Sequence, residues 1–209
     1  MQYKTIRKTA SAEYLIKRSR FIGQICPVQT AQAAADFLAA QKTAHWNAAH
    51  NVHAYVLREG QQQRYSDDGE PQGTAGIPVL DVLRREGVTD CIVVVTRYFG
   101  GILLGAGGLV RAYAHSAKLA LDAGGIVTMA LCSVREVRCA YDFYGRLAAL
   151  VPERGGVIEN VDYGDAVTMR FHVPMPLAET LEAALVDASL GKYRSEPRGE
   201  LYAEISEKT

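Results

Sequence analysis

The stretch RYFGGILLGAGGLVRAY, residues 97–113, is the part of the chain around which the fold is built. It follows the apolar run CIVVV, residues 91–95, whose β-branched residues predict a buried strand. It leads into residues 109–121, where apolar side chains recur at helical spacing. The sequence therefore predicts a strand, a glycine-rich loop and a helix in direct succession.

Five glycines lie in the predicted loop: Gly100, Gly101, Gly105, Gly107 and Gly108. Glycine loses more backbone entropy on folding than any other residue, so this many need a reason. One reason is a close approach of bare backbone N–H groups, at a helix N-terminus, to an anion. Arg97 and Arg111 flank the loop and could add bidentate, charge-assisted contacts. The stretch predicts a phosphate or nucleic-acid site that includes Tyr98, although the glycines could equally serve only to form a tight turn.

The spacing of these glycines fits neither of two common phosphate-binding motifs. No G-x-G-x-x-G dinucleotide fingerprint follows the strand, and no G-K-[ST] completes a P-loop.

The charge of the 209-residue chain is zero overall but unevenly distributed. Residues 1–124 hold 14 Lys/Arg against 10 Asp/Glu, and residues 125–209 hold 9 against 13. A basic first half is compatible with a phosphate-bearing partner, and equally with a solvated surface. The length allows one or two domains.

The cysteines and the apolar runs exclude several protein classes. Cys26, Cys91, Cys132 and Cys139 form no C-x-x-C pair and no zinc-site spacing. No segment resembles a signal peptide, and no apolar run reaches the roughly 18 residues of a membrane span. We therefore expect a cytoplasmic protein with no membrane partner, no bound metal and no cofactor.

A second unusual loop, SDDGEPQGTAG, occupies residues 66–76. Asp68 and Glu70 could bind a hard cation through their carboxylates. They could instead fix the loop together with Asp67 and Thr74, by accepting hydrogen bonds from its backbone, or pair with one of the two arginines. We favour the structural and arginine-pairing interpretations over a metal site.

His50 and His53 belong to a predicted strand over residues 50–58. Residues three apart on a strand point to opposite faces, which argues against a shared metal site. We expect His53 to be a hydrogen-bonded structural histidine and His50, at the strand entrance, to have the more functional role.

The remaining pattern of the first half predicts an α+β fold. Strands are expected over residues 3–10 and 13–28, a helix over 31–43 capped by Thr30, and a helix over 76–85. Residues 122–125 are expected to end the helix that follows the glycine loop and to form a short linker.

The second half has a different pattern. Strands are predicted at 133–140, 157–163 and 166–173, helices at 141–151 and 176–190, and a last strand within 192–205. The order strand, helix, strand, strand, helix, strand is the ferredoxin-like βαββαβ pattern.

Taken together, the two loops resemble the IMPACT family, in particular its bacterial two-domain YigZ-type members. The resemblance is carried by His50 with Ala54-Tyr55, by SDDGEP (66–71) with GTAG (73–76), and by RYFGGILLG (97–105) with GGLVRAY (107–113). It covers nearly the whole chain. His53 departs from the aromatic residue expected two positions before Tyr55, so no family role is assigned to it.

The resemblance implies two domains. Residues 1–124 would form an IMPACT-type domain with a fold like domain 2 of ribosomal protein S5, which translational GTPases and small-molecule kinases share. Residues 125–209 would form a ferredoxin-like domain similar to the last domain of elongation factor G. Eukaryotic members regulate translation initiation under stress by binding a large activator protein, but fold alone does not fix function.

These features lead to three hypotheses. The first is an RNA- or ribosome-binding protein associated with translation, which captures phosphates at the glycine-rich helix N-terminus. The second is an enzyme acting on a phosphorylated small molecule or nucleotide, with Asp68, Glu70 and His50 as candidates for acid–base or Mg²⁺ chemistry. The third is a protein–protein adaptor that docks a protein partner through the paired loops. No nucleophile–base pair is evident from spacing, so we favour binding over catalysis.

Overall fold

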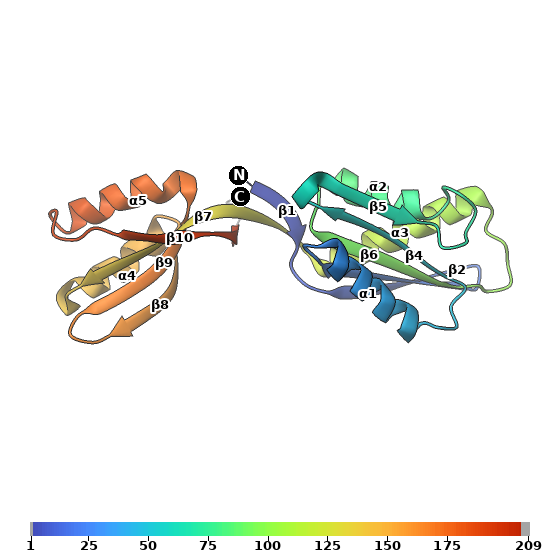
Figure 1. Cartoon of the computed structure of the whole chain (residues 1–209), viewed down its shortest axis with the longest axis horizontal. Helices are drawn as coiled ribbons and strands as arrows, with labels where there is room; N and C mark the ends of the chain where they lie inside the picture. Colours follow the sequence, from blue (N-terminus) through green and yellow to red (C-terminus); the bar gives the residue numbers. More distant parts are fainter. Residues whose placement is uncertain (1, 206–209) are drawn as a thin grey trace. The chain divides into compact units, whose positions relative to one another are not determined.

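The structure is a computed structural model that describes residues 2–205. The chain divides into two compact units (Figure 1). The N-terminal unit comprises Tyr3–Val127, and the C-terminal unit comprises the residues from Thr128 onward together with Gln2. Both units combine antiparallel sheets with helices, as expected for an α+β protein.

The N-terminal unit is built on a five-stranded antiparallel sheet in the order β2-β3-β6-β4-β5. Its strands are β2 (Ala10–Ile16), β3 (Ser19–Pro27), β4 (His50–Leu57), β5 (Gln62–Ser66) and β6 (Cys91–Tyr98), and β1 (Gln2–Ile6) precedes them. Its helices are α1 (Ala31–Ala44), α2 (Gly76–Glu86) and α3 (Ala106–Gly124), with a 3-10 turn, η1 (Glu59–Gln61).

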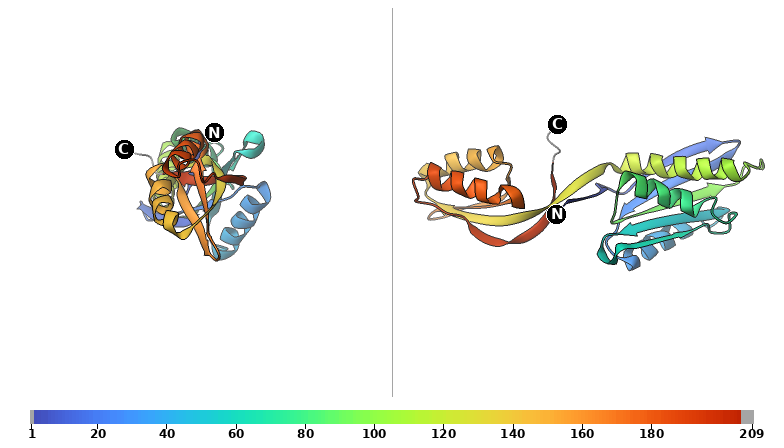
Figure 2. Two further views of the ribbon diagram at one scale, coloured as in Figure 1. Left: turned by 90° about the vertical axis from the view of Figure 1, so that its left-hand side faces the viewer. Right: turned by 90° about the horizontal axis from the view of Figure 1, so that it is seen from above.

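The central strand β6 separates two apolar layers because its side chains alternate between the faces of the sheet. Val93 and Val95 belong to the main core beneath α2 and α3, and Ile92 and Val94 pack with α1 on the other face. Figure 2 shows the helices on both sides of this sheet. Because β6 is covered on both faces, its sequence is a continuous apolar run, and the predicted buried strand is confirmed.

Three boundaries near the loops differ from the sequence expectation. Residues 13–28 form two strands joined by a tight turn at Lys17 and Arg18, both with positive φ. The exposed strand β5 was not predicted, because its sequence, QQRYS, has no apolar face. Strand β6 continues through Arg97 and Tyr98, and α3 already begins at Ala106, so Gly107 and Gly108 form its first turn.

The C-terminal unit has the element order β7 (Ile126–Cys139), α4 (Tyr141–Glu153), β8 (Val157–Tyr163), β9 (Val167–Pro174), α5 (Met175–Ala188) and β10 (Glu196–Ile205). These strands and β1 form a five-stranded sheet in which β7 pairs with β1, β9 and β10, and β9 also pairs with β8. The strands β7 to β10 are therefore ordered β10-β7-β9-β8. Leu147 of α4 and Leu181 of α5 are fully buried in one apolar cluster with Phe171 of β9. Both helices therefore cover the same face of this sheet.

The expected linker at residues 122–125 is shorter in the structure. Gly124 is still helical, and β7 begins at Ile126, directly after Gly125, whose φ is +73°. No helix among the described residues is long and apolar enough to cross a membrane.

Candidate functional site

The acidic loop, which we define as residues 66–76, caps the N-terminus of α2 through the side chain of Asp67. One carboxylate oxygen of Asp67 accepts hydrogen bonds from the N–H groups of Ala75 (3.1 Å) and Gly76 (2.7 Å). The other oxygen accepts from the N–H of Gly73 at 2.9 Å. The Thr74 hydroxyl donates to the Pro71 carbonyl at 2.6 Å. Asp67 and Thr74 thus hold the loop through hydrogen bonds, and Asp67 neutralises the positive end of α2.

Asp68 joins the same loop to strand β4 and helix α1. Its Oδ1 accepts from Lys42 Nζ at 2.8 Å, and its Oδ2 accepts from the N–H of Asn51 at 2.7 Å. Its backbone carbonyl accepts from His50 Nδ1 at 2.8 Å. With both carboxylate oxygens engaged, Asp68 has a structural role in the loop.

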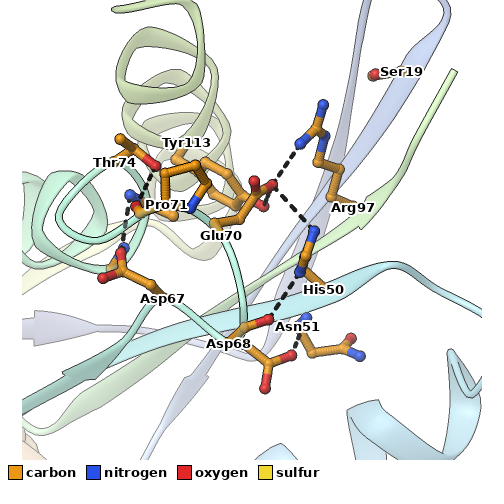
Figure 3. Close-up of polar contacts among 12 residues, drawn as sticks. Ser19, His50, Asn51, Asp67, Asp68, Glu70, Pro71, Thr74, Arg97 and Tyr113 are labelled. Atoms are coloured by element: carbon orange, nitrogen blue, oxygen red, sulfur yellow. Dashed lines mark hydrogen bonds and ion pairs between the residues drawn. The ribbon is translucent and has the colours of Figure 1, made fainter. Parts of the chain in front are cut away.

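The buried side chain of Glu70 bonds to Arg97 of β6 and to Tyr113 of α3 (Figure 3). Its Oε1 accepts from Arg97 Nη1 at 2.6 Å and from the Tyr113 hydroxyl at 2.7 Å, and His50 Nε2 lies 3.8 Å away. The Arg97 and Glu70 side chains are only 6% and 3% exposed. Burial and the adjacent Glu70 carboxylate raise the pKa of Tyr113. The expected contact between the acidic loop and an arginine therefore exists.

The two arginines that flank the glycines have different environments. Arg97 lies within β6, buried between Glu70 and the rings of Phe21 and Phe99, each 5.4 Å from its guanidinium carbon. It therefore anchors the acidic loop and is not a free cation at the surface. Arg111 is exposed on α3, and its Nη1 would lie 3.9 Å from a Cβ placed at Gly107.

The five glycines between β6 and the first turn of α3 are subject to different local constraints. A Cβ at Gly100 would lie 2.0 Å from the carbonyl carbon of Arg18, so only glycine allows the loop to touch the β2–β3 turn. Gly101 and Gly105 have φ of +81° and +72°, a region that favours glycine. A Cβ at Gly108 would meet Leu104 at 3.0 Å. Gly107 has neither a positive φ nor a close neighbour, so the fold does not require glycine there.

The N-terminus of α3 is left open, in contrast to that of α2. Its N-cap is Gly105, no side chain caps it, and its first turn contains no acidic residue. The first intrahelical bond is donated by Leu109, so within residues 2–205 the preceding amides of the first turn have no backbone or side-chain acceptor. The positive end of the α3 dipole is therefore available to an anion.

A cavity of about 440 Å³ lies between the acidic loop and the glycine loop. Its lining includes His50, Glu70 and Arg97 on the polar side, and Phe99, Leu103, Leu104 and Leu109 on the apolar side, with Gly105 and Ala106 of the α3 N-terminus. Phe99 and Leu103 are 50% and 81% exposed. Sequence reasoning did not identify the leucines as part of a site, because apolar residues in a loop carry no distinctive motif.

Two aromatic side chains near the loop and one predicted histidine are less accessible. Tyr113 is fully buried, and the Tyr98 hydroxyl lies 2.8 Å from His45 Nδ1. Of the three aromatic residues near the loop, Phe99 therefore offers the exposed ring. His53 lies on the face opposite to His50, as predicted, but its Nδ1 is buried without a partner among the described residues, so the expected hydrogen bond is not made at that nitrogen.

The turn between β2 and β3 adds two cations that sequence reasoning did not assign to the site. Lys17 and Arg18 occupy a two-residue turn with φ of +44° and +66°, values that normally select Asn or Gly. Neither makes an ion pair with a residue that the structure describes, and both are exposed. Together with Arg111 they form what we call the basic rim of the glycine loop.

Comparisons with known proteins agree with the two-part organisation. The Impact N-terminal domain family matches residues 17–121, and a domain of unknown function (DUF1949) matches residues 137–192. The chain is 37% identical to the IMPACT family member YvyE of Bacillus subtilis, over 91% of this chain and 88% of that protein. It is 38% identical to the IMPACT family member YigZ of Escherichia coli, over 84% of this chain and 88% of that protein.

A solved structure, described as the crystal structure of a hypothetical protein, is also similar. It superimposes with a TM-score of 0.60 at 34% identity, over 93% of this chain and 96% of that one.

Proposed function

The chain belongs to the IMPACT family, and from that premise we propose that it is an RNA-binding protein associated with the regulation of translation. It holds backbone phosphates at the N-terminus of α3, where Arg111 and the other two side chains of the basic rim supply positive charge. The link to translation rests on the family, whose eukaryotic members regulate initiation.

The observation that carries this proposal is the contrast between two helix N-termini of the same unit. The α2 N-terminus is closed by Asp67, and the α3 N-terminus has open amides, no acidic residue and the Arg111 guanidinium beside it. Such a terminus favours a phosphate through both hydrogen bonding and the helix dipole. Gly107, which the fold does not require to be glycine, fits this role, because a Cα without a side chain allows a ligand to approach the backbone.

The strained turn at Lys17 and Arg18 supports the same conclusion. A non-glycine residue at positive φ costs about 1 kcal/mol or more, and such strain is retained mainly where function requires it. Here the cost keeps two cations, without an ion-pair partner among residues 2–205, beside the glycine loop, at a point fixed by the contact between Gly100 and Arg18.

We also propose the finer fold assignments that the family resemblance implies. The N-terminal unit supports a fold like domain 2 of ribosomal protein S5, because its sheet contains β2, β3, β4 and β6 and carries the helices α2 and α3. In the C-terminal unit, the βαββαβ order with strands β10-β7-β9-β8 supports a ferredoxin-like domain, because each β-α-β crossover spans a central strand. Both assignments are compatible with an RNA- or ribosome-associated role.

Binding of a single-stranded RNA oligomer, measured by fluorescence anisotropy, tests the proposal. Arg111→Ala should weaken binding several-fold because it removes a phosphate contact at the α3 N-terminus. Lys118→Ala is the matched control on the same helix, because Lys118 is already paired with Glu86 and Asp122. Equal effects of the two variants, or binding that does not weaken with added salt, would contradict the proposal.

The basic turn provides a second test with opposite effects on stability and binding. Lys17→Asn combined with Arg18→Gly introduces the residue pair that a type I′ turn prefers, so the fold should become more stable. RNA binding should become weaker, because two cations are lost. Recovery of a protein partner from cell extract that survives nuclease treatment, with no RNA binding, would favour the adaptor hypothesis instead.

One observation favours an enzymatic function as a second candidate. The Nδ1–H of His50 is held by the Asp68 carbonyl, so in the neutral imidazole Nε2 carries the lone pair. A base positioned in this way could accept a proton from a phosphorylated substrate held at α3. A panel of phosphoesters and nucleotides, assayed with and without Mg²⁺, would test this candidate, and turnover abolished by His50→Ala would support it.

A further inference from the structure

The cavity between the two loops contains a carboxylate oxygen that makes no hydrogen bond within the described part of the protein. The side-chain contacts of Glu70 with Arg97, Tyr113 and His50 all involve Oε1, and Oε2 has no partner among the described residues. Glu70 as a whole is 8% exposed and lines the cavity. A carboxylate oxygen that lines a cavity and is not bonded within the protein can accept a hydrogen bond from a ligand that donates an N–H or O–H.

A second acceptor lies beside it. The Asp68 carbonyl can only accept a hydrogen bond, so His50 Nδ1 carries the proton, and Nε2 of the neutral ring is an acceptor. This Nε2 lies 3.8 Å from Glu70 Oε1 and belongs to a residue that also lines the cavity. Beside the Arg97 guanidinium, the polar side of the cavity therefore presents two acceptors, which match a group with two adjacent donors.

The remaining walls fit a flat, apolar body that carries an anion. Phe99 and Leu103 are exposed at the mouth, and the Phe99 ring is backed by the Arg97 guanidinium. Gly105 and Ala106, at the open N-terminus of α3, form another part of the lining. Aromatic side chains of this kind are the surfaces on which unstacked bases of single-stranded RNA pack.

We propose that the cavity holds one unstacked guanine nucleotide of a single-stranded RNA, an inference that rests on the proposed RNA-binding function. The base packs against Phe99 and Leu103, and its phosphate lies at the N-terminus of α3. Guanine presents N1–H and the N2 amino group side by side, and these donate to Glu70 Oε2 and His50 Nε2. Uracil presents N3–H between two carbonyl oxygens, which the Glu70 carboxylate would repel.

Titration of the full chain with mononucleotides, followed by NMR or calorimetry, tests the base preference. Guanosine monophosphate should bind at least tenfold more tightly than inosine monophosphate, which lacks the N2 amino group, and more tightly than uridine monophosphate. Equal affinity for the three nucleotides within twofold would overturn the proposal. So would binding of inorganic phosphate as tightly as guanosine monophosphate, because the base would then contribute nothing.

A matched pair of variants tests the location. Ala106→Phe places a ring in the cavity lining and should weaken binding of guanosine monophosphate at least tenfold. Val110→Phe adds the same ring to a part of α3 outside the lining, and binding should stay within twofold. If both variants bind like the unmodified protein, the nucleotide does not occupy this cavity.

Glu70→Gln provides a selectivity readout that a purely structural role would not produce. The carboxamide oxygen would face Arg97 and Tyr113, so the amide N–H₂ would replace Oε2 in the cavity and convert an acceptor into a donor. The preference should then move from guanosine towards uridine monophosphate. An unchanged ratio of the two affinities in the folded variant would overturn the assignment of Glu70.

The two levels of the proposal can fail separately. RNA that binds in an Arg111-dependent manner, together with indifference to the base and to Ala106→Phe, would remove the guanine site and leave the proposed function standing. Absence of both RNA and mononucleotide binding would remove both.

Discussion

At the residue scale, Glu70 shows how a charge can be buried for a structural purpose. Its carboxylate compensates the Arg97 guanidinium in the interior of the N-terminal unit. Buried ion pairs add little net stability over apolar packing, but the loss of one partner is costly, because the other charge remains buried and uncompensated.

Glu70→Ala is therefore expected to lower the free energy of unfolding by about 3–5 kcal/mol, the cost of leaving a buried charge unpaired. Urea denaturation measures the change. Asp81→Ala, which breaks the exposed Asp81–Arg84 pair, is the control and should cost less than about 1 kcal/mol. A similar cost for both variants would show that Arg97 finds another partner.

Gly100 of the loop and Gly107 of the first turn of α3 should respond differently to alanine. Gly100→Ala should strongly destabilise the fold, because its Cβ would collide with the Arg18 backbone. Gly107→Ala should be neutral or stabilising by up to about 1 kcal/mol, since alanine favours helix more than glycine does. Thermal unfolding measures both. If Gly107 serves phosphate approach, its alanine variant should bind RNA more weakly although it is no less stable.

His53 should make stability depend on pH. Burial, followed by the charge of Lys42, lowers its pKa in the folded state below the ordinary value of 6.5. The unfolded chain thus binds a proton more readily. His53 therefore costs no stability above about pH 6.5, and the folded state loses stability as the pH falls from there towards the lowered pKa.

Unfolding by urea at pH 7.5 and at successively lower pH measures this effect. His53→Phe should flatten the dependence, whereas His172→Phe, in the C-terminal unit, should not affect the N-terminal unit. A dependence that survives His53→Phe unchanged would assign it to other groups.

At the element scale, α2 depends on a residue outside it. Asp67→Ala removes the acceptor of two backbone N–H groups at the α2 N-terminus and of one in the preceding loop, and should cost about 1–2 kcal/mol, in the upper part of the range for helix caps. Thr30→Ala, which removes the single cap bond of α1, should cost about 1 kcal/mol. Urea denaturation compares the two, and an equal or smaller effect of Asp67→Ala would contradict its role as the anchor of α2.

The elements that the sequence predicted well are those with strong local signals. Thr30 marks the start of α1, and the apolar run before the glycines marks β6. The exposed strand β5 was missed because its pairing with β4 comes from tertiary structure. The start of α3 was placed too late, because glycines in a first helical turn resemble a loop in sequence.

Prediction of the candidate site had a similar limit. The sequence identified both loops and the alternative that an acidic residue pairs with Arg97. It could not show that the carboxylates of Asp67, Asp68 and Glu70 accept hydrogen bonds from three different elements, because this depends on the three-dimensional path of the loop. Lys17 and Arg18 gave only the weak signal of a basic segment, and their turn becomes evident only from the backbone.

At the scale of the whole molecule, the excess of basic residues lies in the first 124 residues and the excess of acidic residues in the rest. RNA contacts should therefore map to the N-terminal unit. If Lys17, Arg18 and Arg111 neutralise about three phosphates, log affinity should fall with log salt concentration with a slope of about −2 for single strands. Anisotropy titrations at several salt concentrations measure the slope. Arg111→Ala should reduce its magnitude by about 0.7, and an unchanged slope would place the phosphates elsewhere.

The acidic loop connects its three carboxylates to α2, to β4 and to the β6–α3 core, although between Ser66 and Gly76 it has no regular secondary structure. Proteases cut where a segment can detach from the body of a protein and fit an extended cleft. Detaching this segment would break all three anchors at once, so cleavage there should require opening of the whole N-terminal unit. In limited digestion this surface loop should therefore persist as long as the interior strands do.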